Sequence, residues 1–464
     1  MPPNFEPDYV VGAVVPFLLN DQYEGDTPLL PMIDITFSKE NAGPVHIWGM
    51  LYDKWVPDPE EGIGVSFQGY ENRGLNNERK RIYMSATTPD LIVTKYRSKI
   101  IGFFEKFFAD ANSGKPLMHR YCEYYHDLYW DLHLGVSSDA IPVEVRQIGA
   151  SFNTVLGHWY PTLEIVHENY MRVRELRPFV MSWIDARVQD IVNGKTPNRD
   201  RTFVYYWLKN GGQGENFRRK DIIFECFRNL LALSQWGSTT YNVMTRLEAT
   251  HGDPKVKAWF ERTMKNQPEE TDVGPFTPLD RFVMELFRTI TPNTGSLSTL
   301  KRQRHLLDSQ FSTISTGHEN ANMDPRHWNK PEEFDPDRYK TVPTSADNDA
   351  TRCKQVGLVQ CPFPKTSFPV KDGRKVELTN STFGAVYSVI NDRAYPVADT
   401  AGYAFFGFGY RRCPGEHLTV EFIKELCRIA WKEGISFIKL DLENPEPLPV
   451  APRTVINDDI TFKR

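Results

Sequence analysis

A glycine-punctuated, aromatic-rich loop near the C-terminus delivers one cysteine to the start of a helix. Residues 405–416 read FFGFGYRRCPGE, so glycine permits tight turns on both sides of Cys413 and lets a flat group approach closely. The free amides at the start of the following helix would face the sulfur and favour its thiolate form. A thiolate beside cations is a nucleophile or a metal ligand. A nucleophile needs a histidine partner, and the neighbouring His417 is expected to be a surface or packing residue.

The composition excludes several classes of protein. The chain has 464 residues, 40% of them apolar, and a net charge of -5, which argues against disorder and against a basic nucleic-acid-binding surface. Six scattered cysteines without a C-x-x-C pair argue against a disulfide scaffold or a zinc ribbon. No window approaches the length of a membrane span, and acidic Glu6 and Asp8 stand where a signal peptide is basic. We expect a soluble, cytoplasmic protein without a membrane anchor.

Helical patterns dominate from about Asn76 to Trp431, and the sequence predicts a single, mainly α domain over residues 1–464. Residues 1–70 suggest strands and irregular coil and predict a small β region. Residues 340–404 are loop-like, with an Asp-Gly hairpin signal between Phe368 and Leu378. The clearest helices are expected at Pro89–Asp110, Met118–Leu134, Tyr170–Val192, Asp221–Thr250, Pro278–Ile290 and Glu416–Trp431.

Two of these helices carry polar features with open interpretations. The middle of the helix at 221–250 reads QWGSTT over residues 235–240, which is a polar, helix-weak interruption. It is either a kink tolerated by packing or a notch that faces a ligand. In the helix at 278–290, Glu285 and Arg288 stand three residues apart and can face the same partner. Taken alone, such a pair is usually a solvated salt bridge.

The cysteine loop resembles the heme-binding loop of the cytochrome P450 family. Residues 406–415 fill every fixed position of its F-x-x-G-x-R-x-C-x-G pattern. Residues 285–288 (ELFR) resemble the family's E-x-x-R helix, and residues 331–339 (PEEFDPDRY) its P-x-x-F-x-P-x-R stretch. The resemblance implies a cytochrome P450-like heme-thiolate fold over roughly residues 76–431. It also implies a buried structural cluster of Glu285, Arg288 and Arg338.

The resemblance also implies how heme b (iron protoporphyrin IX) would be held. Cys413 would be the axial thiolate of the iron, with Phe406 packed beside the sulfur and Gly415 completing the loop. Arg411 would pair with one heme propionate. Arg81 would pair with the other, although Asn77 replaces the aromatic ring that the family usually has four residues earlier.

The sequence departs from the family in the oxygen-binding helix, which usually reads A-G-x-[D/E]-T. One register puts Trp236 at the alanine, Thr239 at the acid and Thr240 at the threonine. A shift by one residue puts Ser238 at the acid and Thr239 at the threonine, so the carboxylate is missing either way. Trp236 either forms a flat wall for a planar substrate or points into helix packing. A second departure is the 75-residue separation of Arg338 and Cys413, which the expected insertion at 340–404 would explain.

These features suggest three functions. The first is a heme-thiolate oxidoreductase that oxygenates a small apolar or aromatic metabolite, or couples aromatic rings oxidatively. Electrons would come from a separate ferredoxin- or flavodoxin-type donor. The face of this chain that binds the donor would carry a basic patch of Arg412, Lys424 and Arg428, unless these are ordinary solvated charges. The second is a hydroperoxide isomerase, dehydratase or peroxygenase, which needs no electron donor. The third and least favoured is a non-catalytic heme-binding sensor.

Overall fold

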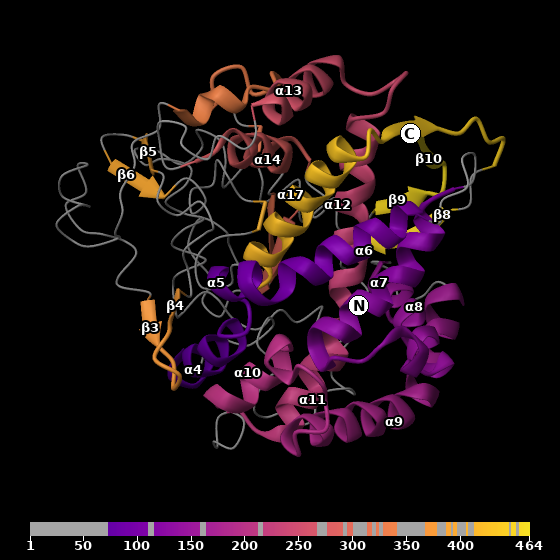
Figure 1. The fold of residues 1–464 in the computed structure, drawn as a ribbon, viewed down its shortest axis with the longest axis vertical. Helices are drawn as coiled ribbons and strands as arrows, with labels where there is room; N and C mark the ends of the chain where they lie inside the picture. Colours follow the sequence, from indigo (N-terminus) through magenta and orange to yellow (C-terminus); the bar gives the residue numbers. More distant parts are fainter. Residues whose placement is uncertain are drawn as a thin grey trace. The chain divides into compact units, whose positions relative to one another are not determined.

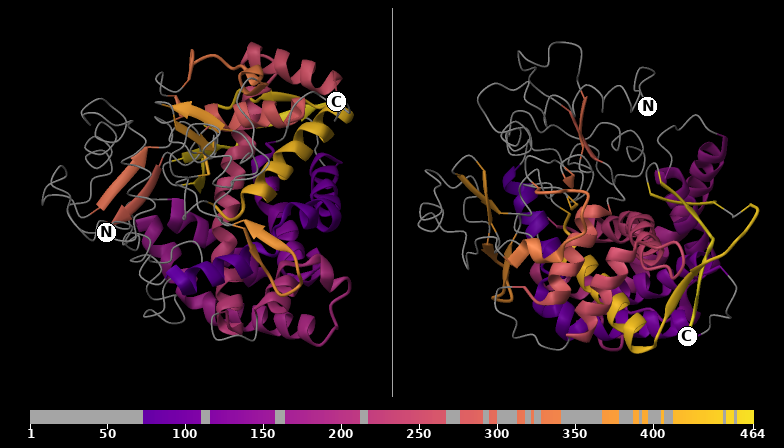
Figure 2. Two further views of the ribbon diagram at one scale, coloured as in Figure 1. Left: turned by 90° about the vertical axis from the view of Figure 1, so that its left-hand side faces the viewer. Right: turned by 90° about the horizontal axis from the view of Figure 1, so that it is seen from above.

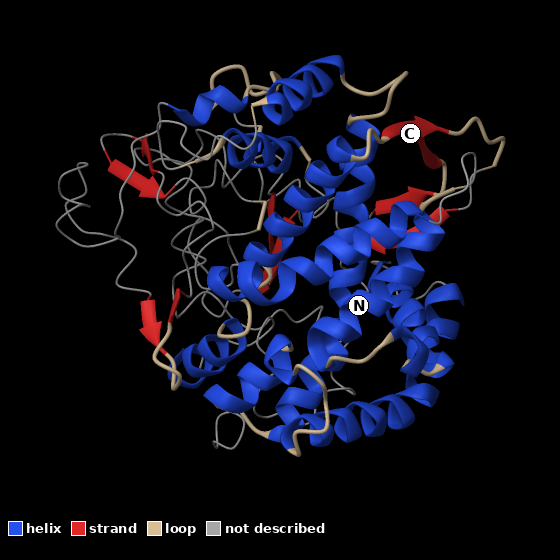
Figure 3. Cartoon of the chain, viewed as in Figure 1, coloured by secondary structure: helices blue, strands red, loops and turns tan. Residues whose placement is uncertain are grey.

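The described part of the chain is mainly helical, and its strands form two-stranded antiparallel sheets (Figures 1 and 3). This arrangement, seen in a computed structural model, confirms the expected fold class. Residues 1–72, where the sequence suggested a β region, lie outside the described residues. The structure describes residues 73–109, 116–157, 164–211, 217–266, 276–290, 295–299, 313–317, 322–323, 328–340, 367–377, 387–390, 393–396, 405–406, 413–444, 447–451 and 454–464.

The chain divides into two compact units, and the single-domain organisation stays a prediction. One unit takes residues 1–85, 271–277 and 284–417, and the other takes residues 86–270, 278–283 and 418–464. Helices α14 (Pro278–Thr289) and α17 (Glu416–Lys432) contribute residues to both. The first unit also contains α4 (Arg73–Met84), β1 (Gly295–Thr299), β2 (Thr313–Gly317), the 3-10 turn η7 (Pro336–Lys340), β3 (Ser367–Pro369), β4 (Lys375–Glu377), β5 (Tyr387–Ile390) and β6 (Arg393–Pro396).

Most of the described helices belong to the second unit, and those between residues 86 and 266 are drawn in indigo to magenta in Figure 2. They are α5 (Pro89–Leu91), η3 (Ile92–Tyr96), α6 (Arg97–Ala109), α7 (Met118–Leu134), η4 (Ser138–Ala140), α8 (Val143–Gly157), α9 (Glu164–Val192), η5 (Arg199–Arg201), α10 (Phe203–Asn210), α11 (Arg219–Arg228), η6 (Asn229–Leu231), α12 (Ala232–Arg246) and α13 (Pro254–Lys265). Strands β7 (Ser436–Lys439) and β10 (Ile460–Lys463) pair antiparallel, as do β8 (Pro447–Ala451) and β9 (Thr454–Asn457). Apart from the long one at 221–250, the predicted helices are confirmed, although α9 begins at Glu164, six residues before the predicted Tyr170.

An aromatic cluster forms the centre of the second unit. Four phenylalanines of α6 stand at helical spacing, so they share one face of the helix, and all four are buried. Phe422 of α17 packs against two of them, with its ring 5.5 Å from that of Phe103 and 4.6 Å from that of Phe104. On its other side, the Phe422 ring stacks on Trp236 of α12 at 4.4 Å. The cluster therefore joins α6, α12 and α17.

The long helix predicted over residues 221–250 is divided, so that prediction is wrong in part. Its break is the 3-10 turn at Asn229–Leu231, whereas residues 235–240 lie inside the unbroken helix α12. The polar side chains there do not interrupt the helix because they bond back to it. The Thr240 hydroxyl donates to the Trp236 carbonyl at 2.7 Å, and the Asn242 amide donates to the Ser238 carbonyl at 2.9 Å.

The predicted hairpin is confirmed in the first unit. Strands β3 and β4 pair antiparallel, with Phe368 opposite Val376. Gly373 has φ of +86°, a left-handed conformation that glycine adopts without strain, and its amide donates to the Val370 carbonyl at 2.9 Å. The Asp-Gly turn therefore directs the strand pairing, as the sequence indicated.

A fully buried carboxylate organises the first unit and confirms the expected Glu-Arg-Arg cluster. The Glu285 carboxylate accepts from Arg288 at 2.7 and 2.9 Å and from Arg338 at 3.1 Å. It also accepts from the Tyr339 hydroxyl at 3.0 Å and from the Asp335 amide at 2.9 Å. Glu285 and Arg288 have no exposed surface. These bonds offset the high cost of burying the charges.

The two arginines also bind backbone of the segments around them. Arg288 donates to the carbonyls of Asn322 and Glu333 at 3.0 and 3.1 Å, and Arg338 donates to the Glu333 carbonyl at 2.8 Å. The Trp328 ring lies 5.2 Å from the Arg288 guanidinium and 5.8 Å from that of Arg338. The cluster therefore fixes an irregular segment, residues 328–340, against α14.

Replacing Glu285 with alanine leaves two buried guanidinium groups without their carboxylate. We expect Glu285→Ala to lower the free energy of unfolding by about 3–5 kcal/mol, measured by urea unfolding, and to reduce heme content. Glu332→Ala, an exposed acid in the same segment, should behave as the wild type. A stable, heme-replete Glu285→Ala protein would contradict the structural role.

Two buried histidines on α7 make the second unit sensitive to acid. Burial lowers the pKa of His126 to about 4 and that of His133 to about 3. The His126 ring occupies the space beside Gly149 of α8, where a Cβ would lie 2.1 Å from a ring carbon. Both rings are neutral in the folded state, whereas a histidine in the unfolded chain has a pKa of 6.5. Below pH 6.5 the unfolded state therefore binds more protons than the folded state. Stability is thus present above pH 6.5 and is lost as the pH falls towards 4.

Lowering the pH from 7.5 to 5.5 should cost about 1.4 kcal/mol of unfolding free energy for each of these histidines. Urea unfolding at the two pH values measures this loss. His133→Gln should remove about half of the total loss that the two histidines cause. His251→Gln, at a side chain 76% exposed, should remove little of it. An unchanged pH dependence in His133→Gln would rule out this source of acid sensitivity.

Candidate functional site

Cys413 lies just before α17, and its side chain is half-buried. Its backbone amide donates to the Phe406 carbonyl at 3.0 Å, and α17 begins three residues later at Glu416. A Cβ at Gly415 would lie 3.8 Å from the sulfur, so the loop passes close to the thiol. The other described cysteines are Cys226 and Cys427. Both are fully buried, and burial raises the pKa of the Cys427 thiol to about 12. Cys413 is therefore the accessible thiol among these three.

Two buried phenylalanines hold the loop before Cys413 against α14. Phe405 stacks on Phe287 with ring centres 4.4 Å apart, and Phe406 meets the same ring edge-on at 5.2 Å. Phe287 lies between Glu285 and Arg288 in sequence, so the helix that carries the buried cluster also positions the cysteine loop. The expectation that Phe406 packs beside the sulfur is compatible with its carbonyl bond to Cys413.

The structure describes one of the two arginines assigned to the heme propionates. Arg411 lies outside the described residues, as do residues 407–410 and Arg412. Arg81 is the basic residue in the last turn of α4 and is half-buried. Its role as a propionate partner stays a prediction.

The indole of Trp236 is engaged in helix packing. Its N–H donates to the Thr419 hydroxyl of α17 at 2.8 Å, and its ring stacks on Phe422 and meets Tyr125 of α7 edge-on at 5.6 Å. Only 7% of the residue is exposed. Of the two interpretations of Trp236, these contacts favour helix packing. Its ring and its N–H both bind neighbouring helices and do not form an open wall for a substrate.

Three consecutive hydroxyl residues follow on α12, and all are buried. Ser238, Thr239 and Thr240 are at most 2% exposed, and residues 235–240 carry no carboxylate. The Thr240 hydroxyl donates a hydrogen bond to the Trp236 carbonyl. Its oxygen can still accept a hydrogen bond and so can orient a polar group or water.

The cations suggested for a basic docking patch are paired with acids. Lys424 contacts Asp280 at 2.8 Å. Arg428 contacts Glu421 at 3.1 Å and also forms an ion pair with Glu425. Burial raises the pKa of the Glu421 carboxyl. Lys424 and Arg428 therefore form a mixed charge network, so the structure corrects the expectation that they present a basic patch.

Several residues important to these sites were not found from the sequence. The sequence placed Thr419 and Phe422 on a helix, but their spacing did not indicate that they contact the indole of Trp236, which is 183 positions from Thr419 in the chain. Tyr339 follows directly after Arg338, so its place beside the motif was the available signal for its bond to Glu285. Trp328 had no such signal.

Two features that bear on function are absent from the described residues. No helix among them is long and apolar enough to cross a membrane. Within the same residues, no group of three or more histidine, cysteine, aspartate and glutamate side chains is arranged to hold a metal ion. A single cysteine ligand to a heme iron does not require such a group.

Comparison with known proteins connects the sequence and the fold to characterised families. No family model matches the chain. A curated relative, "Probable cytochrome P450 305a1" of Drosophila melanogaster, is 26% identical over 183 residues, which are 36% of this chain. The match spans 36%, or about a third, of that relative's own length.

The fold is similar to several solved cytochrome P450 structures. The retinoic acid-bound cyanobacterial CYP120A1 aligns with a TM-score of 0.62 and 13% identity, over 93% of this chain and 87% of that one. A zebra fish cytochrome P450 with progesterone gives a TM-score of 0.59 and 13% identity, over 94% and 92% of the two chains. A mutant of cytochrome P450SP alpha gives a TM-score of 0.56 and 13% identity, over 93% and 89%. These likenesses show the fold.

The bond between Trp236 and Thr419 should stabilise the contact between α12 and α17. We expect a double-mutant cycle of Trp236→Phe and Thr419→Val to give a coupling energy of about 1 kcal/mol in urea unfolding. The same tryptophan change combined with Thr263→Val, at a buried threonine of α13, should be additive. Additivity in both cycles would show that the indole N–H bond contributes nothing to stability.

Proposed function

We propose that this chain is a divergent member of the cytochrome P450 family and that it works as a heme-thiolate oxidoreductase with Cys413 as the proximal ligand. The observation that carries the proposal is the presentation of Cys413. Its side chain is half-buried just before α17, and its amide donates a hydrogen bond to the Phe406 carbonyl. A thiolate needs this combination of access and restraint to bind a metal in one geometry.

The residues present fit the heme that the family implies. Cys413 would bind the iron, Phe406 would pack beside the sulfur, and Arg81 and Arg411 would pair with the propionates. Gly415 suits this role because it adds no side chain next to the sulfur. A bound heme with a thiolate ligand supplies oxidising chemistry, since the thiolate favours cleavage of an O–O bond.

We propose a small apolar or aromatic metabolite as the substrate, and either its monooxygenation or the oxidative coupling of its rings as the reaction. Electrons would come from a separate ferredoxin- or flavodoxin-type donor. Support for the coupling reaction comes from α12, where Ser238, Thr239 and Thr240 stand without a neighbouring carboxylate. Three alcohols relay protons less well than an acid and an alcohol, and ring coupling inserts no oxygen atom.

The same missing carboxylate favours a second candidate function. A hydroperoxide isomerase, dehydratase or peroxygenase receives its O–O bond ready-made, so it needs neither an electron donor nor an acid to protonate dioxygen. Thr239 and Thr240 would then orient the hydroperoxide by hydrogen bonds rather than relay protons.

Turnover under two matched conditions separates these functions. Purified holoprotein is given apolar aromatic substrates with NADPH, ferredoxin and ferredoxin reductase, and in parallel an organic hydroperoxide without reductant. Products that require the reductant support the oxidase, and product analysis distinguishes oxygen insertion from ring coupling. Rapid hydroperoxide turnover alone supports the second candidate. Full heme incorporation with neither activity would contradict both.

Cys413 should give the reduced carbon-monoxide complex its thiolate signature. We expect the long-wavelength absorption band in the wild type and its loss in Cys413→Ala and Cys413→His, because no other thiolate replaces the ligand. Cys427→Ala, at a buried cysteine of α17, should keep the band. Retention of the band in Cys413→Ala would refute the assignment.

Thr240→Ala should lower turnover by much less than the roughly 100- to 10,000-fold that positioned proton transfer can supply. The reason is that the Thr240 hydroxyl already donates to the Trp236 carbonyl and has no carboxylate in residues 235–240 to relay from. Steady-state rates of Thr240→Ala and Thr240→Ser measure the effect. Full loss in the alanine variant with recovery in the serine variant would demonstrate an ordinary relay.

A further inference from the structure

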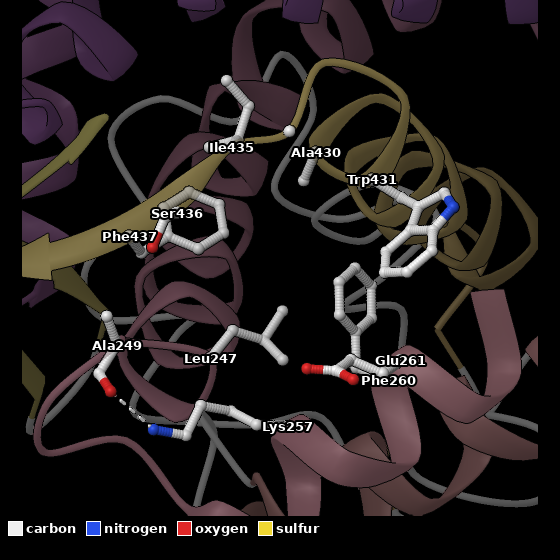
Figure 4. Close-up of a pocket in the computed structure, with 11 residues that line it drawn as sticks. Leu247, Ala249, Lys257, Phe260, Glu261, Ala430, Trp431, Ile435, Ser436 and Phe437 are labelled. Atoms are coloured by element: carbon white, nitrogen blue, oxygen red, sulfur yellow. Dashed lines mark hydrogen bonds between the residues drawn. The ribbon is translucent and has the colours of Figure 1, made fainter. Parts of the chain in front are cut away.

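A cavity of about 610 Å³ lies in the second unit, at the C-terminal ends of α12 and α17 (Figure 4). Its walls come from the residues just after α12, from one face of α13, from the last turn of α17 and from the start of β7. Ligand pockets in proteins usually have volumes of about 300–1,000 Å³, so the cavity is large enough for a small molecule.

Two aromatic rings form one side of the cavity. Phe260 of α13 and Trp431 of α17 meet edge-on, with ring centres 5.9 Å apart and planes at 83°. Phe260 is held from behind by Phe282 at 5.9 Å, and Trp431 keeps 38% of its surface exposed. An exposed indole supported by a fixed ring offers a π face that attracts flat apolar groups and cations.

The cavity is lined by one cation and one acid, Lys257 and Glu261. The Lys257 ammonium is already engaged, because it donates to the Ala249 carbonyl at 2.8 Å, the bond drawn as a dashed line in Figure 4. Glu261 is therefore the group of the lining that can attract a further positive charge.

An acid completes this arrangement. Figure 4 shows the Glu261 carboxylate pointing towards the space between Leu247 and Phe260. Its ion pair with Lys265, at 3.4 Å, joins two side chains that are each more than 60% exposed, so solvent screens it strongly. The Glu261 carboxylate can therefore receive a second cation from the cavity side.

We propose that this cavity binds a planar aromatic molecule that carries an ammonium or quaternary ammonium group. Its rings stack on Trp431 and Phe260, and its positive charge lies near Glu261. The cavity shares no residue with those assigned to the heme, and binding there does not depend on the proposed oxidoreductase activity.

A quaternary ammonium probe tests the site without interference from the heme iron, because its nitrogen has no lone pair to donate. Isothermal titration calorimetry on the holoprotein compares (2-naphthylmethyl)trimethylammonium with neutral 2-naphthylmethanol. We expect the cation to bind at least about threefold more tightly, the range of exposed charge and cation–π interactions. The heme absorption spectrum should not change during the titration.

Variants then locate the bound cation. Glu261→Gln should weaken binding about three- to fivefold, and Trp431→Ala should weaken it about tenfold. Glu105→Gln, at an exposed acid of α6, removes the same charge elsewhere and should leave affinity unchanged. Since Glu261 is exposed, its variant tests the site even where Trp431→Ala is unstable. Equal affinity for the two probes, or wild-type affinity in Glu261→Gln, would overturn the proposal.

Discussion

The buried charge of Glu285 is the constraint on which the first unit depends. A carboxylate without exposed surface is tolerated only when hydrogen bonds replace its lost water, and Arg288, Arg338, Tyr339 and the amide of Asp335 supply them. The arginines in turn satisfy backbone carbonyls of a segment with little regular structure. These buried charges therefore hold the irregular segment at 328–340 in one conformation, a role that apolar packing has in most cores.

The support for the cysteine loop starts from the same helix. Phe287, between the acid and the arginine of the cluster, contacts the rings of Phe405 and Phe406. The Phe406 carbonyl then accepts the amide of Cys413. Three kinds of interaction, namely buried ion pairs, ring packing and one peptide hydrogen bond, thus extend from α14 to the thiol. The position of Cys413 is therefore tied to α14, which carries the buried cluster.

The sequence predicted what depends on local spacing and composition. The helix periods, the Asp-Gly hairpin and the buried Glu285 cluster are confirmed, because each is marked by residues close together in the chain or by an ordered motif. The break in the long helix was misplaced because back-bonding by Thr240 is invisible in a pattern of polarity. The orientation of Trp236 was left open because Thr419 and Phe422 lie far away in sequence.

The contact between α7 and α8 has a consequence for sequence divergence. Helix α8 approaches the His126 ring so closely that a side chain at Gly149 would begin 2.1 Å from a ring carbon. A larger residue at 149 is acceptable only when the ring at 126 gives way to something smaller. A substitution at one of these positions therefore requires a compensating substitution at the other, so residues 126 and 149 should vary together among homologues.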